Sequence, residues 1–140
     1  MRFVIDASVA VRWFLEEERH PHSTLVLDRL LAKPELFAVP ELFCFEVFAV
    51  LQRIHPVSSV YSTTIIPLLQ GGMLRYPMTY DLAKRGHAYC SDGLSGYDAT
   101  YAALAEMLGA LWITFDSKAH RLIEARNVSM DLGKELPSFD

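Results

Sequence analysis

Four acidic side chains interrupt apolar stretches of this 140-residue chain. They are Asp6 after residues 3–5, Glu46 within 43–48, Asp98 beside Tyr97, and Asp116 after 112–115. An ionised carboxylate in a dry interior is costly unless it is paired or binds a metal, and no matching set of Lys or Arg lies beside these four. If the fold gathers them, a divalent cation is the economical explanation. Their oxygens would suit Mg²⁺ or Mn²⁺, ions that activate water for attack on a phosphate.

Helix capping is an alternative role for three of these acids. Asp6 and Asp116 each end an apolar stretch and precede a helical pattern, so either could accept a hydrogen bond from a free backbone N–H. Asp98 follows Ser95 by three positions, a spacing close to that of a capping box. Glu46 differs because it lies well inside a helical pattern and has no charge partner three or four positions away. For Glu46 the alternative is a solvated helix face, which would be unusually apolar.

Short apolar runs that alternate with helical patterns must position these acids. Strands are predicted at residues 3–5, 36–39, 73–76, 110–115 and 128–130. Helices are predicted at residues 9–15, 22–31, 41–53, 58–69, 80–89, 97–108 and 117–125. The helix at 41–53 is apolar nearly all round, so we expect it to be buried on most sides. The alternation predicts an α/β fold with a parallel sheet covered on both faces. Ligands of such sheets bind beyond the carboxyl ends of the strands, where Asp6 and Asp116 both fall.

The composition predicts one domain that spans residues 1–140. The net charge of −4 counts mildly against a passive nucleic-acid binder. It counts less against a metal-dependent enzyme, because bound cations offset the acids that make the count negative. No apolar run approaches the roughly 18 residues of a membrane span, and the N-terminus lacks the organisation of a signal peptide. We therefore expect a soluble, cytoplasmic protein.

The order of the acidic fragments resembles that of PIN-domain ribonucleases, and most of all the VapC-type toxins of toxin–antitoxin pairs. The residues that carry the resemblance are Asp6-Ala7-Ser8-Val9-Ala10-Val11-Arg12-Trp13-Phe14-Leu15-Glu16-Glu17, Pro40-Glu41-Leu42 leading to Glu46, Tyr97-Asp98-Ala99-Thr100-Tyr101-Ala102-Ala103-Leu104-Ala105-Glu106, and Thr114-Phe115-Asp116. Each fragment alone is a weak signal. Four of them in this order, at suitable spacings, extend over essentially the whole chain.

The resemblance implies a three-layer α/β/α sandwich with a central parallel sheet of about four or five strands. It implies an endoribonuclease that hydrolyses RNA phosphodiester bonds with Mg²⁺ or Mn²⁺. Toxins of this type usually form homodimers and are wrapped by an antitoxin protein, and both properties carry over to this chain only by analogy.

The resemblance also implies roles for individual residues. The catalytic, metal-binding set is Asp6, Glu46, Asp98 and Asp116. Ser8 and Thr114 match hydroxyl positions that orient those carboxylates. Some relatives have one more acid where this chain has Ala119, so we expect one well-held metal ion, with a second recruited only with substrate. Arg12 lies within the matched motif and is the best candidate for an RNA phosphate contact.

Other interpretations stay open. Aspartate-based phosphoryl transfer would use Asp6 as the acceptor, but that pattern wants a second Asp where this chain has Ser8, and it gives Glu46 no role. A non-catalytic PIN-like interaction module would keep the acidic pocket as a relic, although all four acids are intact. Nucleotide binding is disfavoured because neither GxGxxG nor GxxxxGK[ST] is present. Most aromatic side chains of the first half are expected in the core; these are Trp13, Phe14, Phe43, Phe45 and Phe48, joined by Tyr101.

Overall fold

The centre of the molecule is a five-stranded parallel sheet with the strand order β3-β2-β1-β4-β5. The computed structural model describes residues 1–54, 59 and 61–139. The strands are β1 (Phe3–Ile5), β2 (Phe37–Pro40), β3 (Leu74–Tyr76), β4 (Leu111–Thr114) and β5 (Ser129–Asp131). The three inner strands are almost wholly buried, as parallel strands covered on both faces must be. All five predicted strands are present, and no end differs by more than one residue.

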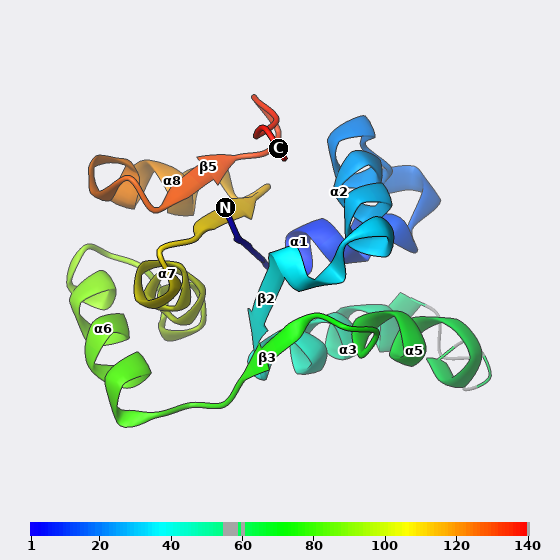
Figure 1. Cartoon of the computed structure of the whole chain (residues 1–140), viewed down its shortest axis with the longest axis horizontal. Helices are drawn as coiled ribbons and strands as arrows, with labels where there is room; N and C mark the ends of the chain where they lie inside the picture. The colour runs from blue at the N-terminus through cyan, green and yellow to red at the C-terminus, as the bar shows by residue number, and fades with distance from the viewer. Residues whose placement is uncertain (55–58, 60, 140) are drawn as a thin grey trace.

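Helices cover both faces of this sheet and make a three-layer α/β/α sandwich (Figure 1). One face carries α1 (Ala7–Ala10), α2 (Pro21–Ala32), α3 (Leu42–Ile54) and α5 (Ile66–Leu69). The other carries α6 (Tyr80–Ser91), α7 (Gly96–Leu108) and α8 (Ser117–Ile123). The α/β class, the parallel sheet and the layering are therefore as the sequence predicts.

Helix α7 lies between α6 and the sheet, and every residue from Ala99 to Ala105 is buried. The alanines of this stretch let the helix approach the strands closely, while Tyr101 stacks on Trp112 of β4 with ring centroids 6.0 Å apart. Ser95 caps the start of α7 by accepting a hydrogen bond from the Asp98 N–H. Gly109 ends the helix in the left-handed conformation at φ 61°, which glycine adopts without strain. The Ser95 cap and the close packing of α7 on the sheet fix the first turn of the helix, which carries Asp98.

The expectation that the helix at residues 41–53 is buried on most sides is wrong. Helix α3 buries one stripe, Phe43, Val47 and Leu51, spaced four residues apart. Phe45 is 69% exposed and Phe48 is 45% exposed, so neither belongs to the core. The helix is part of an outer layer of the sandwich, and the face that carries Phe45 and Phe48 is open to solvent.

Two other helices differ from their predicted forms. The predicted helix at 9–15 is a short α1 followed by a 3-10 turn at Val11–Trp13, and it starts earlier because Asp6 caps it. Within the predicted helix at 58–69, positions 58 and 60 lie outside the described residues. Tyr61–Ile65 is π-helical and leads into α5. Pro67 does not stop α5, because a proline in the first turn of a helix has no N–H to satisfy there.

A candidate acidic site at the carboxyl edge of the sheet

The four acids of the sequence pattern line one pocket of about 180 Å³, together with Ala7, Ser8 and Tyr101. Asp6 follows β1 and Asp116 follows β4, and these strands are neighbours at the point where the strand order reverses. Parallel α/β sheets bind ligands at such a point. Asp98 reaches the pocket from the first turn of α7, and Glu46 from the inside of α3. The structure therefore brings all four predicted acids together.

Asp6 is held by hydrogen bonds from three side chains. It is only 5% exposed. Its Oδ1 accepts from the Ser8 hydroxyl at 2.5 Å and from the Ser8 N–H at 3.0 Å. Its Oδ2 accepts from the Thr114 hydroxyl at 2.5 Å and from Trp112 Nε1 at 3.1 Å. Because both oxygens have donors, the carboxylate is locked in one orientation.

The two hydroxyl residues also tie Asp6 to the segment that carries Asp116. Thr114 Oγ1 accepts a hydrogen bond from the Asp116 N–H at 3.0 Å. Ser8 Oγ accepts from the Phe115 N–H at 3.0 Å and lies 3.3 Å from Thr114 Oγ1. Ser8 and Thr114 thus fix the relative positions of two pocket carboxylates from opposite ends of the chain.

Glu46 is positioned by Tyr101, whose hydroxyl donates to Glu46 Oε1 at 2.5 Å. Tyr101 is core, as expected, but this hydrogen bond was not anticipated. A signal for it is the spacing of Tyr101 three positions after Asp98, which puts both on one face of α7. The contact of Trp112 with Asp6 was also missed. Nothing in an apolar strand marks one indole N–H as the partner of a distant carboxylate.

Burial and mutual repulsion make the negative charges in the pocket unfavourable. The pKa of Asp98 is raised to about 6, first by desolvation and then by the charges of Asp116 and Asp6. Desolvation also raises the pKa of Asp6, against its hydrogen bonds, and the charge of Glu46 adds to the rise. For Glu46, desolvation raises the pKa, the Tyr101 hydrogen bond lowers it, and the charge of Asp98 raises it. The pocket therefore favours a positive ion or a proton.

Capping and the shared pocket are not exclusive roles. Asp6 is the N-cap of α1, and Asp116 Oδ1 accepts from the Ala119 N–H as the N-cap of α8. Asp98 caps nothing that the structure records, because Ser95 caps the start of α7. Each capping carboxylate still lines the pocket. A capping hydrogen bond holds the carboxylate in place without removing the side chain from the lining of the pocket.

The chemistry of the lining fits Mg²⁺ or Mn²⁺. The pocket offers four carboxylates and contains no Lys or Arg among its lining residues. Hard cations of this kind prefer oxygen ligands and keep several waters. Within the described part of the chain, no three His, Cys, Asp or Glu side chains already converge as a preformed metal cluster. The acids share a pocket at distances that water-mediated coordination or small side-chain movements would have to bridge.

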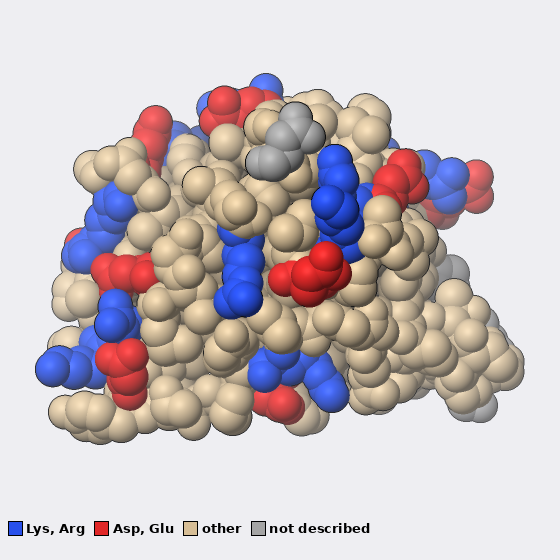
Figure 2. Space-filling view, in the orientation of Figure 1, with Lys and Arg blue, Asp and Glu red and all other residues tan. Residues whose placement is uncertain are grey.

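Arg12, the predicted phosphate contact, packs against the protein. Its guanidinium lies over the Phe115 ring at 4.1 Å from the centroid, and its Nη1 donates to the Glu18 carbonyl at 3.0 Å. A contact between Arg12 and RNA stays a prediction. On the face seen in Figure 2, Lys and Arg are interspersed with Asp and Glu, without a continuous basic track.

Comparisons with known proteins agree with this geometry. The family model of the PIN domain matches residues 3–124. VapC20 of Mycobacterium tuberculosis, described as a sarcin–ricin-loop-cleaving toxin, has a similar fold (TM-score 0.64, 19% identity, 85% of this chain and 93% of that chain). So do a chain of a toxin–antitoxin complex from Klebsiella pneumoniae (0.64, 19%, 84% and 88%) and one of FitAcB from Neisseria gonorrhoeae (0.70, 14%, 95% and 99%).

A search of curated proteins finds no significant match. At these identities the solved structures establish the fold, and the sequence family is established by a match that extends over most of the chain. The matched residues contain the first four strands of the sheet and the four acids that line the pocket. This chain belongs to the PIN domain family.

Proposed function

We propose that this chain is a metal-dependent endoribonuclease that hydrolyses RNA phosphodiester bonds, and that residues 1–140 act as a single catalytic domain. One observation carries the proposal. Four carboxylates from four separate segments line one pocket at the carboxyl edge of the sheet, without a basic residue in the lining. Such an arrangement is unfavourable for the protein alone, and a divalent cation would offset it.

In this proposal Asp6, Glu46, Asp98 and Asp116 hold Mg²⁺ or Mn²⁺, directly or through water. The ion would supply an activated water and would stabilise charge on the attacked phosphate. The protein's own contribution is orientation. Asp6 is fixed by its hydroxyl and indole donors, and Glu46 by Tyr101. In-line attack would leave a 5′-phosphate and a 3′-hydroxyl.

The raised pKa of Asp98 bears on the working pH of this site. With its pKa at about 6 in the metal-free protein, Asp98 is largely ionised at neutral pH and increasingly protonated in acid. Cation binding needs the ionised form. We therefore expect activity to fall as the pH drops below about 6, with metal binding lost over the same range.

The proposal extends to a role as the toxin of a toxin–antitoxin pair, with a cognate antitoxin and a second copy of the chain as partners. The similar structures include a toxin and a toxin–antitoxin complex. The exposed Phe45 and Phe48 on α3 offer an apolar surface of the kind that protein partners cover. The described residues include no helix of the length and apolarity that a bilayer crossing requires, and the proposed place of action is the cytoplasm.

The test uses Asp6→Asn and Asp98→Asn, which remove charge with little change in shape. Purified proteins are assayed on single-stranded and structured RNA with Mg²⁺ or Mn²⁺, and with the metal chelated. We expect metal-dependent cleavage by the wild type and a loss of at least about 100-fold in each variant, because transition-state stabilisation by a metal is worth several kcal/mol. Undiminished, metal-independent cleavage by both variants would refute the proposal. Mn²⁺ binding without any cleavage would favour the non-catalytic interaction module.

A further inference from the structure

A second, larger pocket is lined in part by the same two helices, α3 and α7, as the acidic one, and it has no role in the hydrolysis described above. It has a volume of about 460 Å³, within the usual range for a small-molecule site. Its walls are apolar side chains from the ends of β2 and β3, from the segment between β3 and α6, and from α3, α6 and α7: Pro40, Tyr76, Met78, Leu42, Leu82 and Tyr97. Polar groups are few and lie among Glu41, Ser95 and Thr100.

Helices α3 and α7 each contribute residues to both pockets, although no single residue lines both. On α3, Leu42 faces the apolar pocket and Glu46, one helical turn later, faces the acidic pocket. On α7, Tyr97 and Thr100 line the apolar pocket, while Asp98 lines the acidic one. One helical turn is about 5.4 Å, which is comparable to the span of a single nucleotide. A strand with a phosphate at the acids would therefore place a neighbouring base at the apolar pocket.

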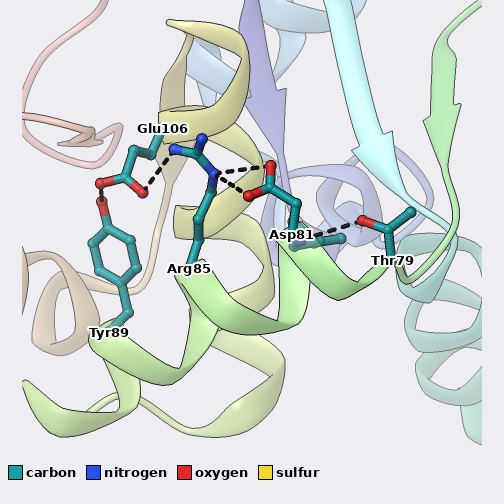
Figure 3. A network of polar contacts seen from close by, with 6 residues as sticks. Thr79, Asp81, Arg85, Tyr89 and Glu106 are labelled. Carbon is teal, nitrogen blue, oxygen red and sulfur yellow. Dashed lines mark hydrogen bonds and ion pairs between the residues drawn. The ribbon is translucent and has the colours of Figure 1, made fainter.

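Helix α6, which contributes Leu82 to the wall of the apolar pocket, is held in place by polar contacts outside the pocket. Thr79 caps α6 by accepting from the Leu82 N–H at 3.2 Å, and it follows the segment that carries Met78. Further along α6, Arg85 pairs with Asp81 and reaches across to Glu106 of α7 (Figure 3). Because α6 is clamped to α7, the pocket is preformed.

We propose that this pocket binds one unpaired nucleobase of the RNA substrate, next to the phosphate that is cleaved. A base has two apolar faces and a polar edge. The faces suit the rings of Tyr76 and Tyr97 and the thioether of Met78, and single-stranded bases commonly stack on such side chains. The edge carries N–H groups that can donate hydrogen bonds to the Glu41 carboxylate at the pocket. The inference rests on the proposed nuclease function and names the part of the substrate that the pocket reads.

Gly96 offers a way to close this pocket. It lines the pocket, and a Cβ built there meets nothing within 4 Å. Its φ is not in the left-handed region, so side chains are tolerated. Gly96→Leu should fill the cavity without displacing the backbone, and Gly96→Ala, which adds one methyl group, is the matched control. Circular dichroism and the melting temperature show whether either variant folds.

The first experiment measures binding without cleavage. Protein with Asp98→Asn and ¹³C-methyl-labelled methionine is titrated with a short single-stranded RNA, and in parallel with an abasic strand of equal length. Met78, which is 62% exposed, is assigned with Met78→Leu. We expect its methyl resonance to shift with RNA and to stay in place with the abasic strand, because only a base brings a ring current. The shift should vanish in Gly96→Leu and persist in Gly96→Ala.

The second experiment measures cleavage of a random single-stranded RNA library by otherwise wild-type protein. We expect a base preference at one position beside the cut, and Gly96→Leu should weaken it while raising KM about tenfold and leaving kcat within about twofold. If the wild type shows no metal-dependent cleavage, the nuclease function is refuted. The methionine chemical shifts test the base pocket independently of that result.

Three outcomes would overturn the base pocket: equal Met78 shifts with both strands, no shift with either, or an unchanged base preference in Gly96→Leu. If Gly96→Leu instead abolishes inhibition by the cognate antitoxin, with RNA binding and cleavage unchanged, the pocket receives a protein segment and the proposal is wrong.

Discussion

Two polar clusters of this molecule treat charge in opposite ways. In the cluster between α6 and α7, Arg85 lies between Asp81 and Glu106, and Tyr89 donates to Glu106 at 3.2 Å (Figure 3). In the acidic pocket four carboxylates line one space, and the groups that donate to them from the described residues are all neutral. In the first cluster a cation lies between the two acids and offsets part of their charge. The second leaves a net negative charge at a buried edge, which is expected where a ligand rather than the fold supplies the counter-charge.

The largest expected difference between the clusters is their response to a divalent cation. At neutral pH, Mn²⁺ at 100 times its Kd should raise the free energy of unfolding by about 2.7 kcal/mol. Glu106→Gln should retain this gain because Glu106 lies outside the pocket, whereas Asp98→Asn should lose most of it. Thermal melts with and without Mn²⁺ measure the effect. Equal gains in both variants would place the ion elsewhere.

Thr114→Val comes next in size. The change removes the hydroxyl that donates to Asp6 Oδ2 and accepts from the Asp116 N–H. A buried carboxylate then loses a donor and a buried N–H loses its acceptor, so we expect a loss of about 2 kcal/mol in unfolding free energy. Urea denaturation of the metal-free protein measures it. Thr63→Val, on an exposed hydroxyl, is the control and should change stability much less.

The raised pKa of Asp98 predicts a pH dependence with a definite sign. Asp98 has a pKa of about 6 in the folded metal-free protein, above its ordinary value of 3.8. The folded state therefore holds the proton more tightly, and unfolding free energy should fall as the pH rises from about 4 to above 6. Asp98→Asn should raise stability at neutral pH by about 1 kcal/mol, after a reduction for solvent screening at this partly exposed side chain.

Urea denaturation of the metal-free protein across this pH range checks the prediction, with the exposed Glu124→Gln as control. A wild-type profile that Asp98→Asn leaves unchanged would show that other groups titrate there. The wild-type stability rising from pH 4 to 7 would contradict the sign itself.

The smallest effect is expected in the paired cluster. Glu106→Gln removes one partner of Arg85 at a partly exposed site, and such ion pairs contribute about 0.2–1 kcal/mol. The loss should shrink at high salt, because screening weakens the pair in the wild type. Unfolding measured at low and high salt tests this. A loss above about 2 kcal/mol would mean that this cluster is a major source of stability.

Much of the architecture was predictable because it depends on local pattern. Residues 3–5 and 110–115 read as strands by their apolar runs, and the Asp that follows each lies at a helix start. The position of Asp6 and Asp116 after predicted parallel strands was enough to predict a common edge for these two acids. The exposed face of α3 was not predictable, because an apolar helix has the same composition whether its outer side meets the same chain or is left open.

The finer geometry of the pocket could not be predicted from the sequence, for a different reason. The hydrogen bond from Trp112 to Asp6 depends on the pairing of β4 with β1, and the bond from Tyr101 to Glu46 depends on how α7 packs against α3. The spacing of Tyr101 after Asp98 places both on one face of α7 but does not identify Glu46 as the partner. Arg12 lies within the matched motif, but its contacts with Phe115 and Glu18 follow from the packing of a neighbouring turn. Residue type identified the acids and the resemblance named Ser8 and Thr114, whereas the hydrogen bonds of Trp112 and Tyr101 were not expected.

The adjacency of β1 and β4 has a consequence for the timing of synthesis. Thr114 and Asp6 are 108 positions apart and meet only after β4 has paired with β1. A growing chain still attached to the ribosome cannot assemble the acid rim until β4 and Asp116 have emerged from the exit tunnel. Any hydrolytic power that the rim confers is thereby withheld from translation products that end before β4.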